Sequence, residues 1–523
     1  MGQDDKSARR ATREKLAEAD AKHARGDLPG AVDDYLEVLN RDAASVPAWW
    51  GLASAFATRG QHAAAVGCLS ELIDRAPRSV EAHHNLGRSL FSLGNLDAAI
   101  DEFRLAYAIE PNSASLGMLA VLIPQCPRAD LDEILETRLA WAKTLPIAGA
   151  DFGLSEIGEQ SLRLGYVSSF FSSRNWMKPV WGLINAHNRT RFEIVLFSDG
   201  PLDAIGPEYR RDPRDSFVEM TGRSNDQVAE LVKSRKIDIL VDLNAFSKFA
   251  RLPLFAMRPA PVSVEWFALF ATSGMTCFDA LIGDPTVIRP GDSTFFIEPL
   301  VCVPGSYMTF EVGYEVPEVT PPPCTLGEPF TFGCLAPQYK ITPDVLLAWG
   351  RILAGAAGSR LLLKSTFLQI EGNRDWLKDR MKEAGIDVAR VILEGPAEHY
   401  AFLEKYAEID VALDTFPYNG GTTTTEAIWQ GVPVLTFLGD RWIGRISASL
   451  ERNGGLGEFV TENLEGHIRQ AITMANDPET PTRLQETRGK IRQRLRVSPV
   501  CDVQGFARSM EAIYQELWAN RDP

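Results

Sequence analysis

An internal repeat of 34 residues at the start of the chain limits what this sequence can fold into more than any other feature does. Gly26, Gly60 and Gly94 follow one another at this spacing. Four further sets of positions repeat in register with them: Ala31, Ala65 and Ala99; Val32, Val66 and Ile100; Tyr35, Leu69 and Phe103; Ala43, Pro77 and Pro111. A glycine permits a tight turn between two helices, and a proline ends the second helix. The pattern therefore predicts three stacked pairs of helices.

These units resemble tetratricopeptide repeats. The resemblance implies an α-solenoid over residues 1–115, and the concave surface of such an array binds extended segments of other proteins. The same pattern is compatible with a scaffold that only stabilises the chain or mediates self-association, and it names no partner. Residues 116–160 are expected to form a helical connector, with a helix over 131–145 followed by a loop.

Composition excludes several classes of function. The formal charge of −15 and the absence of a basic patch argue against nucleic acid as a partner. Seven cysteines without a CxxC pair indicate reduced thiols, and no histidine has the spacing of a metal ligand. The amino terminus lacks the apolar core of a signal peptide, and the most apolar stretch, 262–278, is too short to span a bilayer. We expect a cytoplasmic protein that needs no membrane and no metal, and the sequence leaves the oligomeric state open.

From residue 162 onward, short apolar runs alternate with amphipathic segments, which is typical of βαβ units and parallel sheets. Residues 161–315 and 330–523 are each expected to form a doubly wound α/β domain, joined by a proline-rich linker over 316–329. The expected strands are 162–167, 192–197, 237–243, 262–266, 330–334, 360–364, 391–394, 409–413 and 433–437. The expected helices between and after them are 228–234, 343–353, 375–384, 399–408, 424–430 and 503–518. Ligands of such domains bind at the carboxyl ends of the strands.

One segment combines a glycine turn, four threonines and a carboxylate. Asn419-Gly420-Gly421 follows an expected buried strand, four threonines begin the next helix, and Glu426 lies one turn into that helix. Glycines allow backbone N–H groups to approach a ligand, and a helix N-terminus favours negative charge. A pyrophosphate suits this arrangement, with Glu426 accepting hydrogen bonds from ribose hydroxyls. An Asn-Gly turn followed by a threonine N-cap explains the same residues without any ligand.

Five segments, in order along the chain, resemble the O-GlcNAc transferase family, which includes SPINDLY-like proteins. They are Leu164–Ser169, Leu254–Trp266, Ser273–Asp284, Tyr339–Pro343 and Tyr418–Pro433, and the likeness spans about residues 162–457. The resemblance implies a GT-B fold of two Rossmann-like domains after the repeats. It also implies transfer of a sugar from a nucleotide-sugar donor to Ser or Thr of a protein, without a cofactor.

The resemblance assigns roles to particular residues. The family lysine that neutralises the departing pyrophosphate falls on Lys340, next to Tyr339 in the same motif. Thr422 and Thr423 hold phosphate oxygens and Glu426 holds the ribose. Donor-binding positions further include Tyr339, Asn419, Gly420, Gly421 and His399, the last where animal members carry a base-contacting lysine. Donors fixed toward the departing phosphate lower the barrier because they act on charge that develops in the transition state.

The chain departs from the family pattern at Arg174, which stands where the family has an active-site histidine. A guanidinium stays charged and cannot act as a general base, but it can hold a carboxylate or phosphate. Three readings remain open. The chain uses a nucleotide sugar such as UDP-GlcNAc; it uses a CMP-linked acidic sugar, as expected of relatives that glycosylate flagellin; or it is a non-enzymatic adaptor with a degenerate transferase. The retained Lys340 and Glu426 favour an enzyme, and Arg174 is equally compatible with a surface ion pair.

Overall fold

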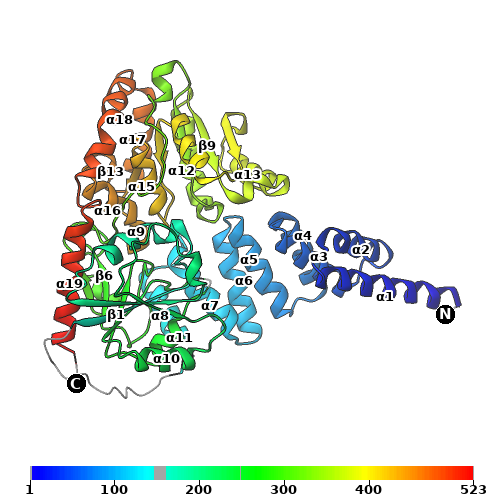
Figure 1. Ribbon diagram of the computed structural model, residues 1–523. Helices are drawn as coiled ribbons and strands as arrows, with labels where there is room; N and C mark the ends of the chain where they lie inside the picture. Colours follow the sequence, from blue (N-terminus) through cyan, green and yellow to red (C-terminus); the bar gives the residue numbers. More distant parts are fainter. Residues whose placement is uncertain (1–2, 147–160, 248, 522–523) are drawn as a thin grey trace. The chain divides into compact units, whose positions relative to one another are not determined.

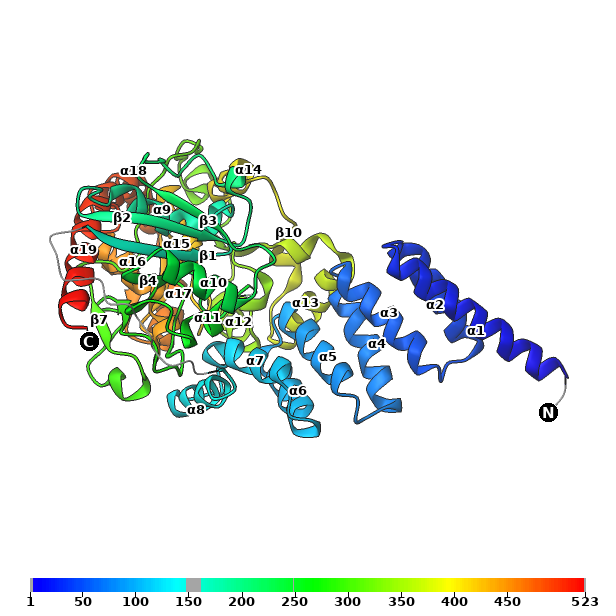
Figure 2. The ribbon, with the colours of Figure 1, turned by 60° about the horizontal axis from the view of Figure 1, so that its bottom comes forward.

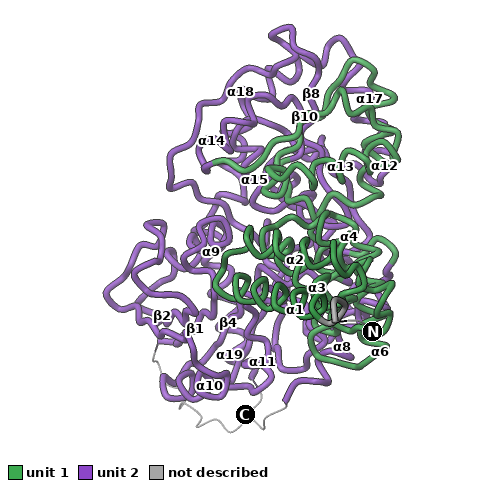
Figure 3. Tube along the Cα trace, turned by 90° about the vertical axis from the view of Figure 1, so that its right-hand side faces the viewer, with its two compact units in different colours: residues 1–122, 126–128, 335–397 green, residues 123–125, 129–334, 398–523 purple. Residues whose placement is uncertain are grey.

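The computed structural model describes residues 3–146, 161–247 and 249–521. It divides into two compact units (Figure 3). Unit 1 comprises Met1–Leu122, Cys126–Arg128 and Leu335–Ala397, and unit 2 comprises Ile123–Gln125, Ala129–Cys334 and Glu398–Pro523. The loop expected near the end of the connector falls mostly on residues 147–160, which lie outside the described residues. The five-part domain division stays a prediction.

The repeats of unit 1 form the three expected helix pairs (Figures 1 and 2). Their helices are α1 (Gln3–Ala24), α2 (Leu28–Arg41), α3 (Val46–Thr58), α4 (His62–Arg75), α5 (Val80–Ser92) and α6 (Leu96–Ile109). The three repeat glycines have φ angles of 81°, 72° and 84°, which a side chain disfavours. The repeated alanines and Tyr35, Leu69 and Phe103 are buried between the helices, so the period predicted both the turns and the core.

Unit 1 also contains part of the chain far from the repeats in sequence. Strands β9 (Arg360–Lys364) and β10 (Val391–Glu394) pair in parallel. The other elements of unit 1 are α7 (Ser113–Leu122), α12 (Pro343–Gly355), α13 (Glu371–Glu383) and the short 3-10 helices η5 (Gln338–Lys340), η6 (Thr366–Gln369) and η7 (Val388–Arg390). Helix α12 begins where the sequence predicts, because Thr342 caps it and Pro343 occupies its first turn.

Unit 2 contains a seven-stranded parallel sheet in the order β3-β2-β1-β4-β5-β6-β7. Its strands are β1 (Leu162–Ser168), β2 (Phe192–Ser198), β3 (Ser216–Glu219), β4 (Ile239–Asp242), β5 (Val262–Trp266), β6 (Ala280–Gly283) and β7 (Leu300–Cys302). The chain adds β2 and β3 on one side of β1 and β4 to β7 on the other side, as in doubly wound folds. Because β1 and β4 are parallel neighbours, their carboxyl ends lie next to each other. Helices α8 (Leu131–Ala142), α9 (Arg174–Ala186), α10 (Asn225–Ser234) and α11 (Leu252–Ala256) and the 3-10 helices η1 (Ile123–Gln125), η2 (Leu202–Ala204), η3 (Asp292–Phe295) and η4 (Pro323–Leu326) complete this part.

Within unit 2, further parallel strands have the order β8-β11-β12-β13. They are β8 (Thr331–Cys334), β11 (Val411–Leu413), β12 (Val434–Phe437) and β13 (Val460–Thr461). The helices that follow are α14 (His399–Glu404), α15 (Thr422–Trp429), α16 (Ile446–Asn453), α17 (Leu464–Asn476), α18 (Thr480–Arg496) and α19 (Val503–Ala519), with η8 (Lys405–Glu408), η9 (Trp442–Gly444) and η10 (Gly457–Phe459). The terminal helix α19 packs back on α9, where Glu511 accepts a hydrogen bond from the backbone of Asn188 just beyond the helix.

Every strand and helix expected from sequence is present, with ends that differ by a few residues. Strands β3, β6, β7 and β13 were not predicted from the sequence. Among the residues that the structure describes, no helix is both long and apolar enough to cross a bilayer.

Candidate functional site

The loop between β11 and α15 is held in shape by Asp414, the first residue after the strand. Its carboxylate accepts hydrogen bonds from the backbone N–H groups of Thr415 and Gly420, each at 2.9 Å, and from the Thr436 hydroxyl at 2.7 Å. The side-chain nitrogen of Asn419 donates to the carbonyl of Thr415 at 2.8 Å. Asn419 was predicted to bind the donor, and the structure shows that its amide nitrogen fixes the turn.

Glycine is required at position 420 because the backbone passes close to the first turn of α15. A Cβ there would lie 2.3 Å from Thr424 Oγ1 and 2.9 Å from Thr423 Oγ1. The helix begins at Thr422, two residues earlier than expected, with Gly421 as its N-cap. The N–H groups of such a first turn lack helical partners and attract an anion. This geometry suits the predicted pyrophosphate site at Gly420, Gly421, Thr422 and Thr423.

The four threonines divide into two kinds. Thr424 and Thr425 are buried and bonded within the protein: the Thr424 and Ser447 hydroxyls are 2.9 Å apart, and Thr425 donates to the carbonyl of Thr422. Thr422 and Thr423 are half-buried. The pair that the family resemblance assigned to phosphate is therefore the pair that solvent reaches.

Glu426, one turn into α15, belongs to a buried group of charges that sequence reasoning found only in part. Its carboxylate forms an ion pair with the ammonium of Lys178 from α9. His399 Nε2 lies 2.8 Å from the same carboxylate oxygen and 3.0 Å from Lys178 Nζ. Lys178 also donates to Asn175 Oδ1 at 2.8 Å. The structure thus brings the predicted residues His399 and Glu426 together, around a lysine that was not predicted.

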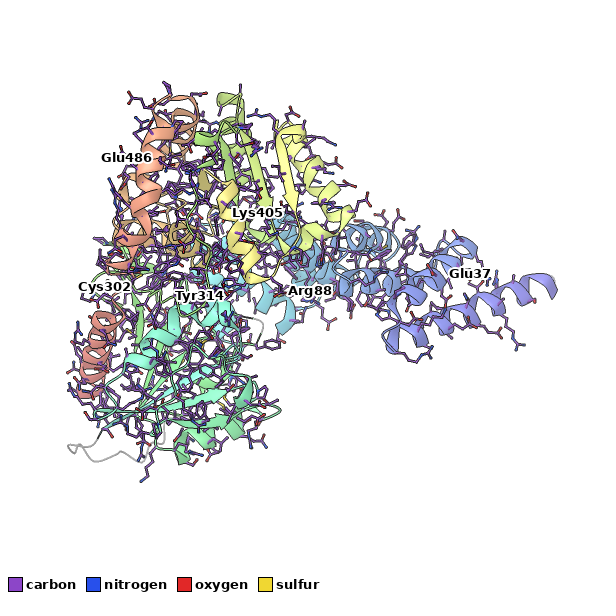
Figure 4. The ribbon with its side chains drawn as sticks, turned by 45° about the horizontal axis from the view of Figure 1, so that its top comes forward. Glu37, Arg88, Cys302, Tyr314, Lys405 and Glu486 are labelled. Carbon is purple, nitrogen blue, oxygen red and sulfur yellow. The ribbon has the colours of Figure 1, made fainter. Side chains whose placement is uncertain are left out.

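The ring of Tyr314 covers this group (Tyr314 is labelled in Figure 4). Lys178 Nζ lies 4.8 Å from the centre of the Tyr314 ring, and the ring of His399 meets Tyr314 edge-on at 5.0 Å. Burial lowers the pKa of Lys178, while the Glu426 carboxylate opposes that shift. Both Lys178 and His399 contact the same oxygen, Oε1, of the Glu426 carboxylate.

Arg174 lies one turn before Lys178 on α9 and pairs with Glu208 at 2.7 Å. The Arg174 side chain is 45% exposed, whereas the carboxylate oxygens of Glu208 are buried, so water reaches only the arginine half of the pair. Arg174, Lys178 and Tyr314 line one pocket of about 160 Å³, together with Trp181, Gly182, Pro207, Glu208, Arg210, Glu311 and Gly313. Arg174, which the resemblance aligns with a family histidine, therefore lines a cavity and has a carboxylate partner in Glu208.

Lys340 and Tyr339 lie in unit 1, at the end of the 3-10 helix η5. The Lys340 side chain is buried, and Tyr339 is half-buried with its ring packed on Phe91 at 5.0 Å between ring centres. Burial raises the pKa of Tyr339 to about 12. The neighbouring Gln338 is buried, and within the described part of the chain neither atom of its side-chain amide has a hydrogen-bond partner. A buried amide without a partner suits a position that contacts a ligand.

Sequence reasoning missed Lys178, Tyr314 and Gln338. The sequence around Lys178 could have indicated its role, because it is flanked by the apolar residues Met177, Pro179, Val180 and Trp181. A lysine in such surroundings is rarely buried unless it has a charged partner. Gln338 adjoins Lys340 in the predicted motif, whereas nothing in the sequence near Tyr314 distinguishes it. Among the described residues, no three His, Cys, Asp or Glu side chains are grouped to hold a metal ion.

Comparison with known families decides the relationship. The profile of glycosyl transferase family 41 matches residues 150–313 and 328–510, more than half of the chain. The chain belongs to glycosyltransferase family 41. A tetratricopeptide-repeat profile matches residues 16–67 and 56–114, as the 34-residue period predicted.

Individual members of the family are similar over most of the chain. The probable UDP-N-acetylglucosamine–peptide N-acetylglucosaminyltransferase SPINDLY of Hordeum vulgare is 29% identical over 423 residues, 78% of this chain and 44% of that protein. The protein of the same name from Arabidopsis thaliana is 30% identical over 368 residues, 69% of this chain and 40% of that protein. The chain thus spans less than half the length of these curated relatives.

A solved structure matches almost the whole chain. A lysine-to-methionine mutant of the Thermobaculum terrenum O-GlcNAc transferase has a TM-score of 0.83 and 29% sequence identity. The match covers 99% of this chain and 98% of that one. The expected fold class, tetratricopeptide repeats followed by two parallel-sheet α/β domains of the GT-B type, is confirmed.

Proposed function

We propose that this chain is a protein O-GlcNAc transferase that moves N-acetylglucosamine from UDP-GlcNAc to Ser or Thr hydroxyls of a protein. The observation that carries the proposal is the first turn of α15, where Thr422 and Thr423 are accessible and a buried carboxylate, Glu426, follows one turn later. Membership of family 41 and the match to a bacterial O-GlcNAc transferase over 99% of the chain support it.

The proposed chemistry forms a bond between the acceptor oxygen and the anomeric carbon and breaks the bond from that carbon to the phosphate. UDP leaves with the bonding electrons, and the hydroxyl proton is released to solvent water. Lys340 is proposed to neutralise the departing pyrophosphate, and Thr422 and Thr423 to donate hydrogen bonds to it. Glu426 and His399 are proposed to hold the nucleoside. Arg174 cannot take the hydroxyl proton, because a guanidinium stays charged at neutral pH.

The repeats are proposed to bind the protein acceptor, in keeping with the general use of such arrays. A cytoplasmic location and flagellin as the acceptor remain predictions. The hypothesis of a CMP-linked acidic donor depends on Arg174 binding the sugar carboxylate. Arg174 already pairs with Glu208, so the structure adds no support for that donor. We therefore keep UDP-GlcNAc as the proposed donor.

A donor panel tests the proposal. The purified chain is titrated by calorimetry with UDP-GlcNAc, a GDP-linked neutral sugar and a CMP-linked acidic sugar, and is then incubated with each donor and a Ser/Thr peptide library. We expect UDP-GlcNAc to bind most tightly and to add the mass of one N-acetylhexosamine to a subset of peptides. Preferential use of the CMP donor would replace the proposed donor, and absence of transfer from every donor would favour the adaptor.

Two variants of α15 serve as matched controls. Thr423→Val removes one accessible hydroxyl with little change of volume and should weaken UDP binding. Thr425→Val removes a hydroxyl that bonds only within the helix, to the carbonyl of Thr422, so binding should be largely retained. Equal losses in the two variants would mean that the phosphate assignment is wrong.

A further inference from the structure

The turn of the third repeat contacts the segment that carries Lys340, and both belong to unit 1. The glycine of the third repeat, Gly94, lies between α5 and α6. A Cβ at this position would lie 2.4 Å from the carbonyl oxygen of Ile341 and 2.8 Å from that of Gln338. Backbone therefore packs directly on backbone on both sides of Lys340. Immediately before this turn, the ring of Phe91 packs on Tyr339.

The second repeat makes a comparable contact one element further on. The side chain of Asn373, at the start of α13, donates to the carbonyl of Gly60 at 2.8 Å and accepts from the backbone N–H of Ala63 at 3.1 Å. The ring of His62 meets Phe367 of η6 edge-on at 4.8 Å. Asn373 is fully buried, and α13 lies beside α4 (Figure 2). These contacts fix η6 against the repeats.

The two contacted segments are joined to each other. The backbone N–H of Gln338 donates to the hydroxyl of Ser365, the residue before η6, at 2.9 Å. Helix η5 itself is only three residues long, so hydrogen bonds within it cannot fix its place. The Gly94 turn, Phe91 and Ser365 all contact this segment and contribute to its position.

We propose that repeats 2 and 3 position Lys340, with Gly94 and Phe91 as positioning residues, in addition to any role in binding the acceptor. This inference rests on the proposed role of Lys340 in neutralising the leaving group. A cation that stabilises developing charge must be held to a fraction of an ångström, so a shift of η5 lowers the rate of the chemical step. The effect should appear even with an acceptor too short to reach the repeats.

The repeat itself supplies the test, because its three glycines share one conformation and differ in surroundings. Gly26 has φ 81°, and a Cβ added to it would have no atom within 4 Å, whereas Gly94 has φ 84° and faces the carbonyl oxygens beside Lys340. Gly26→Ala therefore carries the conformational cost of alanine alone. Gly94→Ala carries the same cost and also pushes η5 away. Gly60 is intermediate, since its nearest neighbour is the flexible end of Ile370 at 3.3 Å.

The measurement is kcat and KM for UDP-GlcNAc with a short Ser-containing peptide, in the full chain. We expect Gly94→Ala to lower kcat at least about tenfold, equivalent to ~1.4 kcal/mol in the barrier. Gly26→Ala should stay within about twofold of the wild type, since an added Cβ there would have no atom within 4 Å. If Gly94→Ala does not fold, Phe91→Ala replaces it, with Phe91→Tyr restoring the ring and the rate. A folded Gly94→Ala variant with the kcat of Gly26→Ala would overturn the inference.

A readout that needs no activity separates this inference from the proposed function. Hydrogen exchange of the amides of residues 338–341 should be faster in Gly94→Ala than in Gly26→Ala. If exchange rises as expected but Lys340→Ala retains full turnover, Lys340 does not have its assigned role. The repeats would then hold the segment without affecting catalysis. If exchange is the same in both variants, the repeats do not hold this segment, and the inference is wrong whatever the enzyme does.

Discussion

Deletion of the Lys178 charge should show how strongly the candidate site depends on a residue that the sequence did not single out. Lys178→Met retains the length and the apolar stem of the side chain and removes the ammonium. The side chains of Lys178 and Glu426 are only 2% and 4% exposed, so water cannot replace the missing cation. Removing one partner of a buried pair costs about 3 to 5 kcal/mol. Because His399 also contacts this carboxylate, we expect the lower end, about 3 kcal/mol.

Helix α9 provides the matched control. Arg174 lies one turn earlier and pairs with Glu208, and these side chains are 45% and 13% exposed. Water reaches the guanidinium of Arg174 but not the ammonium of Lys178, so Arg174→Met should cost clearly less stability than Lys178→Met. The double variant Lys178→Met/Glu426→Gln should regain most of the loss, because a neutral amide leaves no uncompensated charge.

The assay is native-state hydrogen exchange of the amides of α9 and α15, which reports local stability in a chain of several domains. The double-mutant cycle then gives the coupling energy between Lys178 and Glu426. A loss below about 1 kcal/mol in Lys178→Met, equal to that in Arg174→Met, would refute the argument, since the buried pair would then behave like a surface pair.

Three further predictions address single residues. Lys340→Ala should abolish transfer, while the circular dichroism spectrum and the stability measured without UDP should stay unchanged. Full turnover by the folded variant would refute the role of Lys340 in neutralising the leaving group. Arg174→Ala should leave UDP-GlcNAc affinity unchanged in calorimetry but weaken a CMP-linked acidic sugar if that sugar binds at all; a selective loss of UDP-GlcNAc would contradict this. Burial lowers the pKa of His467 to about 4. Unfolded histidine has a pKa of about 6.5, so the unfolded state binds more protons between these values. The wild type should therefore lose about 3 kcal/mol relative to His467→Leu as the pH falls from 7 to 4, whereas parallel denaturation curves would refute the linkage.

The fold was largely predictable because its signals are local and periodic. The 34-residue period gave both the helix pairs and the buried positions, as Tyr35 and Phe103 show. The apolar runs of β1, β2 and β5 gave the parallel sheet because these strands are buried on both faces and lack alternation. Strands β7 and β13 have three and two residues, and their pairing depends on neighbours that no local pattern reveals.

The candidate site was predictable only where it is continuous in sequence. The residues from Asn419 to Glu426 lie in one loop and helix, and a motif can report them together. Lys178 reaches Glu426 across 248 residues of sequence, and Tyr314 joins them from a third segment. Side chains brought together by tertiary packing have no common local signature. Arg174 was identified by its place in a motif, and its exposure and its partner Glu208 became visible only in the structure.

The three repeat glycines have the same backbone conformation but different neighbours in the folded chain. Gly26, Gly60 and Gly94 occupy the same position of the repeat, and the turn between two helices explains each of them. That explanation is complete for Gly26. At Gly94 it is not, because the absent Cβ also allows the backbone beside Lys340 to approach the turn. A residue that serves a turn is thereby also part of the support of a proposed catalytic lysine, so a substitution tolerated in the first repeat should fail in the third.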